Sequence, residues 1–224
     1  MKIGKTNIYP TKIICLGRNY LDHIKETNAP TPSEPVFFVK TLNTLITDNK
    51  PIIYPKILFH NPDFNRVDHE VELAFIISKV CKNVLAEKAY DYIMGYTIFL
   101  DLTARIMQKT DRNLNLPWYR SKNFDTFGPI GPRIVSCSEI EDPHNLNIEL
   151  KVNGVIKQSS NTNHMLFRIP EILEYITKYL TLDSGDIVAT GTPSGISPIV
   201  PGDIIEASIE KIGTITHKVI LEGE

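Results

Sequence analysis

Short apolar segments alternate with turn residues in the second half of the chain, a pattern typical of β-strands. Residues 146–152 and 155–159 flank Asn153-Gly154, a pair that tolerates positive φ angles and therefore predicts a type I′ hairpin turn. Further segments of high β propensity, separated by Gly-Asp turns, cover residues 187–190, 204–209 and 214–221. The pattern predicts a chain built largely from strands.

Helical periodicity is confined to a small part of the chain. Residues 170–180 repeat isoleucine, tyrosine and leucine at helical spacing behind Pro170, which suits the first turn of a helix. A shorter helix is expected to follow Glu87 and to end near Gly95. Few, scattered helices among many strands predict the α+β class rather than a doubly wound sheet.

The composition is that of an ordinary globular chain, and it argues against two classes of partner. A total of 24 Lys and Arg against 26 Asp and Glu leaves a net charge of −2, without the basic excess of a nucleic-acid-binding protein. No stretch approaches the ~20 apolar residues of a membrane span, and the first residues lack the apolar region of a signal peptide. Three widely spaced cysteines favour reduced thiols over a disulfide framework or a structural zinc site. We therefore expect a cytoplasmic protein with no nucleic-acid or membrane partner.

The length of 224 residues suits one domain with one hydrophobic core. The proline-rich stretch at residues 30–35 predicts an exposed loop rather than a domain boundary, because the residues before it are too few to hold a core. Residues 1–224 are therefore expected to form a single catalytic domain.

Two glutamates stand two positions apart at the start of an apolar run. In a strand, residues i and i+2 share a face, so Glu70 and Glu72 would project side by side. Carboxylates held so close repel each other unless one is protonated or a cation lies between them. The alternative interpretation is a solvent-facing edge strand, in which alternating glutamates are common.

A third carboxylate, Asp101, ends another apolar run. If a helix begins there, Asp101, Arg105 and Gln108 fall on one polar stripe at i, i+4 and i+7. The alternative is an ordinary N-cap aspartate with an exposed ion pair. Together with Glu70 and Glu72, Asp101 would complete three oxygen ligands suited to Mg²⁺ or Mn²⁺, with positions left for water or substrate.

A histidine and a glutamate lie three residues apart in the first part of the chain. On a helical turn, His23 and Glu26 would be adjacent, so the carboxylate could orient and polarise the imidazole. Such a dyad suits a general base that activates water near neutral pH. The alternative is an exposed helix with a routine histidine–glutamate pair.

Six sequence blocks follow one another in the order seen in a known family. They are GRNYLDHIKE, HEVELAFII, GYTIFLDLTARIMQ, LPWYRSKNFDTFGPIGP, VNGVIKQ and GDIVATGTPSG. With these blocks the chain resembles the fumarylacetoacetate hydrolase superfamily, and most closely its short members of the acylpyruvate hydrolase and oxaloacetate decarboxylase type. The resemblance implies a mixed β-sandwich roll, a homodimer, and one Mg²⁺ or Mn²⁺ ion per active site.

The resemblance also implies roles for individual residues. By motif, Glu70, Glu72 and Asp101 match the metal ligands, and His23 with Glu26 matches a water-activating dyad on a lid at about residues 18–35. The remaining matches are groups that position or stabilise the substrate, namely Arg18, Arg105, Gln108, Lys122 and Thr192. The chain departs from close relatives at Asp68, where they often carry a histidine; this residue lies beside the implied site.

The implied reaction is hydrolysis of a carbon–carbon bond in 2,4-dioxo acids of the acylpyruvate type. The metal and Lys122 would stabilise the pyruvate enolate, and His23 with Glu26 would deprotonate the attacking water. Decarboxylation of oxaloacetate and isomerisation of 2-hydroxyhepta-2,4-diene-1,7-dioate use the same enolate, so both remain alternatives. A metal-stabilised module that only binds 2-oxo acids is the alternative without catalysis.

Overall fold

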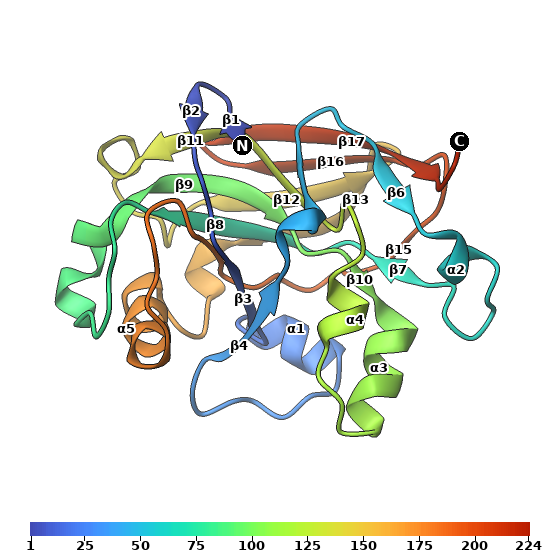
Figure 1. Cartoon of the computed structure of the whole chain (residues 1–224), viewed down its shortest axis with the longest axis horizontal. Helices are drawn as coiled ribbons and strands as arrows, with labels where there is room; N and C mark the ends of the chain where they lie inside the picture. The colour runs from blue at the N-terminus through green and yellow to red at the C-terminus, as the bar shows by residue number, and fades with distance from the viewer.

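Two large β-sheets form the framework of the protein, which a computed structural model describes over residues 1–224 (Figure 1). The larger sheet is mixed, with parallel pairing of β14 to β3 and of β11 to β5. Its seven strands, in spatial order, are β4 (Val36–Lys40), β3 (Ile13–Gly17), β14 (Ile187–Ala189), β8 (Val71–Ile77), β9 (Ile93–Leu100), β11 (Gly128–Ser136) and β5 (Leu45–Thr47).

The second large sheet is antiparallel except at one edge, where β17 pairs with β6 in parallel. Its five strands, in spatial order, are β13 (Val155–Asn161), β12 (Asn147–Val152), β16 (Ile204–Ile209), β17 (Gly213–Leu221) and β6 (Ile52–Tyr54). Two small sheets complete the strands, one of β10 (Thr103–Ala104), β7 (Val67–Asp68) and β15 (Pro198–Ile199), the other of β1 (Lys2–Ile3) and β2 (Thr6–Asn7). The predicted α+β class and mixed β-sandwich roll are confirmed.

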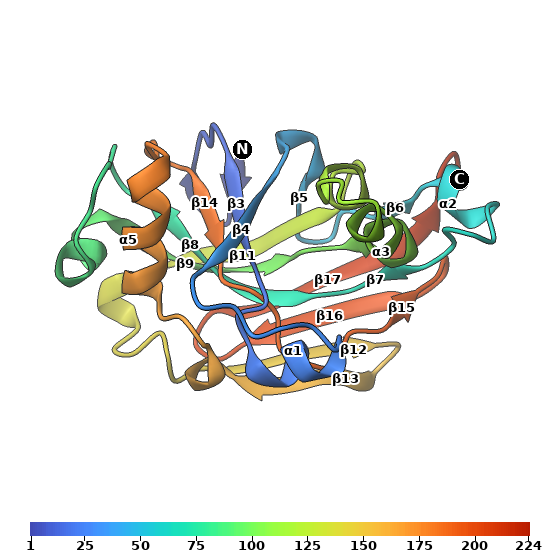
Figure 2. The ribbon, with the colours of Figure 1, turned by 90° about the horizontal axis from the view of Figure 1, so that it is seen from below.

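The helices are short and lie mainly on one side of the sheets, as Figure 1 shows and as the view from below in Figure 2 repeats. The α-helices are α1 (Leu21–Glu26), α2 (Lys56–Phe59), α3 (Arg105–Asn113), α4 (Tyr119–Lys122) and α5 (Ile169–Tyr179). Single 3₁₀ segments are η1 (Leu42–Thr44), η2 (Ala86–Tyr92), η3 (Cys137–Glu139) and η4 (Thr162–His164).

A continuous hydrophobic core lies between the sheets. The central strands are buried on both faces, and their residues are therefore mostly apolar. All seven residues of β8 are buried, because β14 and β9 flank the strand and other elements cover both of its faces. Forty-two buried residues, drawn from both large sheets and from α5, form the main hydrophobic cluster. A polar side chain on β8 is therefore forced into the interior, which matters for Glu72.

Two of the predicted elements match the structure closely. The hairpin between β12 and β13 turns at Asn153 and Gly154, whose φ angles are 52° and 77°. Helix α5 carries Pro170 in its first turn and buries Ile172 and Ile176. These elements depend on local backbone preferences and on periodicity, both of which can be read along the chain.

Two helix predictions were wrong. The helix expected between Glu87 and Gly95 is the 3₁₀ segment η2, and Gly95 lies in β9, so close to β11 that a Cβ there would come within 2.2 Å of a backbone oxygen. The helix expected from Asp101 begins four residues later at Arg105, because residues 103 and 104 pair with β7 as strand β10. Tertiary pairing overrides the local helical pattern in both places.

The remaining expectations concern loops, thiols and membranes. Residues 28–35 contain no helix or strand and are mostly exposed, as the proline-rich sequence predicts. All three cysteines are free, as expected. No helix is long and apolar enough to cross a membrane.

Candidate metal centre and active site

The three predicted carboxylates meet where β8 and β9 lie side by side. Glu70 precedes β8, Glu72 belongs to it, and Asp101 directly follows β9. The antiparallel register pairs Val71 with Leu100, so the two strand ends coincide, and the Asp101 N–H donates to the Glu70 carbonyl over 2.9 Å. One ligand oxygen from each carboxylate lies within 4.8 Å of the others. All three residues are buried, so the edge-strand interpretation is wrong.

Glu72 carries the clearest sign that this cluster suits a cation. Its Oε2 accepts a hydrogen bond from the Gly191 N–H over 2.8 Å, but its Oε1 is buried without any partner. Burial, together with the negative charges of Asp101 and Glu70, raises the pKa of Glu72 well above its ordinary value. A divalent cation would satisfy the unpartnered oxygen and relieve the repulsion, so the residues present fit such an ion.

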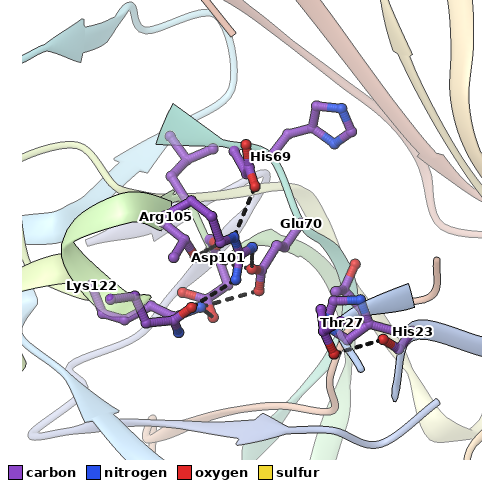
Figure 3. Close-up of polar contacts among 12 residues, drawn as sticks. His23, Thr27, His69, Glu70, Asp101, Arg105 and Lys122 are labelled. Carbon is purple, nitrogen blue, oxygen red and sulfur yellow. Dashed lines mark hydrogen bonds and ion pairs between the residues drawn. The ribbon is translucent and has the colours of Figure 1, made fainter. Parts of the chain in front are cut away.

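Two cations approach the same carboxylates from α3 and α4. The Lys122 ammonium donates to Glu70 over 3.1 Å and also to Asp101, and the Arg105 guanidinium donates to Glu70 (Figure 3). Burial alone would raise the pKa of Glu70, but the charges of Lys122 and Arg105 outweigh it and hold the pKa below its ordinary value. In this site, Glu70 is therefore stabilised as an anion by neighbouring cations, whereas Glu72 has no cation that offsets its burial.

Lys40 is a site residue that the sequence analysis missed. It ends β4, is completely buried, and donates to Asp101 over 2.9 Å and to the Leu102 carbonyl over 3.3 Å. It also donates to the backbone carbonyl of Lys122, so it connects the segment that carries Asp101 with the segment that carries Lys122. The signal was a lysine that closes the apolar run VFFV, because a lysine in that place is either a strand end in water or a buried ion pair.

Arg105 is fixed by neighbours other than Asp101. Its guanidinium donates to Asp68 over 2.8 Å and to Gln108 over 2.7 Å. The alternative interpretation of Asp101 as an N-cap with an exposed ion pair to Arg105 is therefore wrong, while the adjacency of Arg105 and Gln108 is confirmed. Asp68, expected beside the site, is buried there and also accepts from Arg66 over 2.8 Å.

His23 and Glu26 form the expected pair on α1. The His23 Nδ1 lies 3.1 Å from the Glu26 Oε2, and the other oxygen of Glu26 accepts from the Gly195 N–H over 3.0 Å. Burial would raise the pKa of Glu26, but the hydrogen bonds from His23 and Gly195 outweigh it and lower the pKa. Because only 8% of His23 is exposed, the interpretation as a pair on an exposed helix is wrong for the histidine.

One cavity of about 350 Å³ connects these groups. Figure 3 shows the acidic residues with Arg105 and Lys122 on one side and His23 on the other. Nine of the predicted site residues line the cavity, namely Glu70, Asp101, His23, Glu26, Lys122, Arg18, Arg105, Gln108 and Thr192. Glu72 lies behind them, in the wall.

Two predicted substrate-contacting residues differ in what they can offer. The Thr192 hydroxyl already donates to the Val71 carbonyl over 2.9 Å and accepts from Gln158 over 2.8 Å, so it is committed to holding the wall together. The Arg18 side chain, in contrast, has no hydrogen-bond partner in the protein and lies 5.9 Å from the centre of the Trp118 ring. Its place at the cavity is therefore open to a ligand.

Comparisons with known proteins identify the family of the chain. The model of the fumarylacetoacetate hydrolase C-terminal family matches residues 12–220. The chain belongs to this family. The mitochondrial oxaloacetate tautomerase of Bos taurus is 39% identical over 207 residues, which cover 92% of this chain and 90% of that protein.

Two solved structures of family members show the same architecture. The 2-hydroxyhepta-2,4-diene-1,7-dioate isomerase of Mycobacterium marinum is 39% identical with a TM-score of 0.83, covering 97% of this chain and 77% of that one. The fumarylpyruvate hydrolase of Pseudomonas aeruginosa, solved with Mn²⁺ and pyruvate, is 27% identical with a TM-score of 0.88, covering 98% and 93%. Proteins similar to this chain thus include a hydrolase, an isomerase and a tautomerase, and the hydrolase structure contains Mn²⁺.

In this member of the fumarylacetoacetate hydrolase family, other cavity residues were not predicted from the sequence. Among them are Arg66, Lys109, Arg112 and Trp118. Lys109 and Arg112 follow Gln108 on α3, so helical periodicity from Arg105 was an available signal. Arg66 lies in a loop and had no such signal.

Proposed function

We propose that the protein is a divalent-metal-dependent hydrolase that cleaves a carbon–carbon bond in 2,4-dioxo acids of the acylpyruvate type. One observation carries the proposal: Glu70 and Asp101 of the carboxylate cluster line one cavity together with the histidine–glutamate dyad, and Figure 3 shows His23 across from them. A module that only binds 2-oxo acids needs the carboxylate cluster but does not need the histidine–glutamate dyad. The arrangement therefore favours an enzyme over a binding module.

Glu70, Glu72 and Asp101 would hold the cation, for which we propose Mg²⁺ or Mn²⁺. When bound, such an ion polarises a 2-oxo group and stabilises negative charge on its oxygen. Lys122 and Arg105 contribute positive charge beside the same carboxylates, in a buried setting where charge interactions are strong. Lys40 keeps Asp101 oriented through its ion pair.

The dyad supplies the proton transfer that hydrolysis needs. Glu26 holds the His23 imidazole through Nδ1, which leaves Nε2 to accept a proton from water. The water attacks the distal carbonyl of R–CO–CH₂–CO–COO⁻, and the C3–C4 bond breaks with its electron pair left on the pyruvate part. Protonation of that enolate at C3 gives pyruvate, and the other product is the carboxylate R–COO⁻. Lys122 supports the enolate oxygen while the negative charge is present.

A second candidate is tautomerisation of oxaloacetate, favoured by the likeness to the bovine tautomerase. This reaction moves one proton between C3 and the enol oxygen, and His23 is placed to carry it. Decarboxylation of oxaloacetate and isomerisation of 2-hydroxyhepta-2,4-diene-1,7-dioate would draw on the same charge stabilisation.

The proposal is tested by turnover of the purified protein with Mg²⁺ or Mn²⁺. Acetopyruvate loss, pyruvate formation and the keto–enol exchange of oxaloacetate are measured separately, with and without excess chelator. Hydrolysis of acetopyruvate that disappears with chelator supports the proposal. Rapid oxaloacetate tautomerisation without any pyruvate release from acetopyruvate would replace it by the second candidate.

A further inference from the structure

A single buried amide joins the strand of the carboxylate cluster to the loop that contacts the dyad. Gln158, on β13, is completely buried, and its side chain makes four hydrogen bonds, as many as an amide can form. At the start of β8, its Oε1 accepts from the Val71 N–H over 3.1 Å and lies 2.9 Å from the His69 Nδ1. Its Nε2 donates to the Thr192 hydroxyl and to the Pro193 carbonyl, each over 2.8 Å.

A bulge in β13 lies directly beside this amide. Gln158 pairs with Leu150 of β12, but the register then shifts and leaves Lys157 without a partner of its own. Residues 155–157 are exposed, and Gln158 is the first residue of the strand that is buried. Bulges commonly occur where a strand re-aims a side chain beside a functional site. An edge strand of the second sheet thereby contributes a buried group to the wall of the cavity.

The same bulge contacts the far end of the 191–195 loop. Gly195 lies so close to the Lys157 carbonyl that a Cβ there would come within 2.0 Å of the oxygen, and its φ of 99° also suits glycine. The near end of the loop is anchored separately, because the Thr190 N–H and hydroxyl both donate to the Leu73 carbonyl of β8. The far end therefore takes its position from β13.

Gln158 also reaches the far end of the loop through His69. Because Oε1 of the amide can only accept, the proton of His69 lies on Nδ1, and Nε2 is free to accept. That nitrogen lies 2.8 Å from the Ser197 hydroxyl, two residues beyond Gly195. The loop is thus held on both sides of Gly195 by contacts that lead back to Gln158 or to the bulge next to it.

The far end of the loop is where the dyad is attached. The Gly195 N–H donates to one oxygen of Glu26 over 3.0 Å, and the other oxygen lies 3.1 Å from the His23 Nδ1. A carboxylate fixed at one oxygen can orient an imidazole with the other, and small displacements of such groups cost much of their catalytic effect. The orientation of His23 therefore depends on where the loop places the Gly195 N–H.

We propose that Gln158 is a positioning residue for the histidine–glutamate dyad. Through its amide and the neighbouring bulge it holds the 191–195 loop, and the loop holds Glu26. Glu26 in turn keeps the proton of the His23 imidazole on Nδ1, so that Nε2 stays available as the base. The kinetic consequence rests on the proposed function, whereas the fixed imidazole does not.

Two variants loosen the loop in different ways. Gln158→Met keeps the approximate shape of the side chain and removes all four hydrogen bonds of the amide. Gly195→Ala keeps the amide and forces the loop away from β13, because the new Cβ would meet the Lys157 carbonyl. Gly202→Ala is the matched control, since its φ of 100° is nearly the same but a Cβ there meets nothing within 4 Å.

Nuclear magnetic resonance of the imidazole nitrogens reports which of them carries the proton. Spectra are recorded at a pH of about 8.5, where imidazoles are usually neutral, and His23→Ala identifies the signals of that residue. The wild type and Gly202→Ala should show His23 with its proton fixed on Nδ1, whereas both loop variants should show a mixture of tautomers. In the loop variants, kcat for acetopyruvate hydrolysis should fall about 10²-fold while KM changes less than about 2-fold, because the dyad transfers a proton and does not hold the substrate.

The outcomes separate this role from a general effect on folding and from the proposed function. Melting temperatures show whether each variant is folded, and Gly195→Ala decides the proposal alone if Gln158→Met does not fold. A His23 proton that stays fixed on Nδ1 in either folded loop variant overturns the proposal, and so does a rise in KM at unchanged kcat. A wild type that does not hydrolyse acetopyruvate overturns the proposed function, while loss of the fixed tautomer in the loop variants would still establish the positioning role.

Discussion

At the scale of single residues, Glu72 is the most informative side chain of the site. It is fully buried on a central strand, its Oε1 has no partner, and its pKa is raised by burial and by two neighbouring acids. A buried carboxylate without compensation destabilises the folded protein. A cation bound at the cluster would offset this destabilisation, because it would supply the partner that Glu72 lacks.

The first prediction concerns the substitution Glu72→Gln, which keeps the shape and removes the charge. Mn²⁺ or Mg²⁺ should raise the melting temperature of the wild type, because a ligand of the folded state stabilises it, and this rise should vanish in the variant. The apo variant should be as stable as the wild-type apo protein or more stable. Differential scanning calorimetry measures both quantities.

Glu87→Gln is the matched control, since it removes an exposed acid far from the cluster and should leave the metal effect unchanged. Glu70→Gln is a poorer test, because it would also deprive Arg105 and Lys122 of a partner. A metal-induced rise of equal size in Glu72→Gln would contradict the assignment of this residue as a ligand.

At the scale of elements, Asp186 fixes the start of β14 to the start of β3. Its buried carboxylate accepts from the Thr11 N–H over 2.8 Å, the Asp183 N–H over 2.7 Å and the Lys12 ammonium over 2.6 Å. Burial would raise the pKa of Asp186, but these hydrogen bonds outweigh it and lower the pKa. The same strand leads directly into the 191–195 loop that contacts Glu72 and Glu26.

The second prediction follows from that lowered pKa. A carboxylate with a depressed folded-state pKa adds stability above its unfolded pKa of ~4, and this stability is lost as the pH falls through the folded value. Asp186→Asn should therefore cost about 1–2 kcal/mol at pH 7 and less at pH 3, so the variant's stability should depend less on pH in this acidic range. Urea denaturation between pH 7 and 3 measures this, with the exposed Asp91→Asn as control. Parallel profiles for the variant and the wild type would contradict it.

The third prediction is that residues 18–35 act as a lid. Helix α1 contacts the 191–195 loop through the hydrogen bond from Gly195 to Glu26, and residues 28–35 contain no regular structure to brace it. A lid that carries a catalytic group typically becomes ordered over its ligand. Hydrogen exchange of 18–35 should therefore slow when oxalate and Mn²⁺ are added, while α5 serves as an internal reference. Full protection of this segment without ligand would argue for a fixed wall instead.

Much of the site could be read from local sequence, and the failures share a cause. The placement of Glu70 and Glu72 on one strand, and of His23 beside Glu26, depends on the repeat of a single element. Lys40 and Arg66 reach the site only through long-range packing of a strand end and a loop, which no local pattern reports. For Asp101, the predicted place in the cluster agrees with the structure. The helix assumed to begin there starts four residues later, because β10 pairs with β7.

At the scale of the whole molecule, the seven-stranded sheet and helix α1 bring the carboxylate cluster and the His23–Glu26 pair to one cavity. The cluster lies at the ends of the buried central strands β8 and β9, whereas the dyad lies on a short helix at the surface. In the proposed mechanism, a metal centre on the sheet with the base on the predicted lid would let the enzyme admit substrate and then exclude water.

The fourth prediction is the homodimer implied by the family resemblance. Light scattering coupled to size exclusion should give twice the chain mass of 25.3 kDa at micromolar concentration. A mass equal to that of one chain would contradict it, and the site would then have to function within a single subunit.

The most direct test of the account is the effect of His23→Ala on two reactions of the same protein. Hydrolysis of acetopyruvate requires an activated water and should fall by ~10²- to 10⁴-fold, whereas decarboxylation of oxaloacetate requires only charge stabilisation and should fall far less. The exposed His60→Ala should leave both rates unchanged. Equal loss of the two activities would mean that His23 closes the cavity without acting as the base, and no loss of either would remove it from the site.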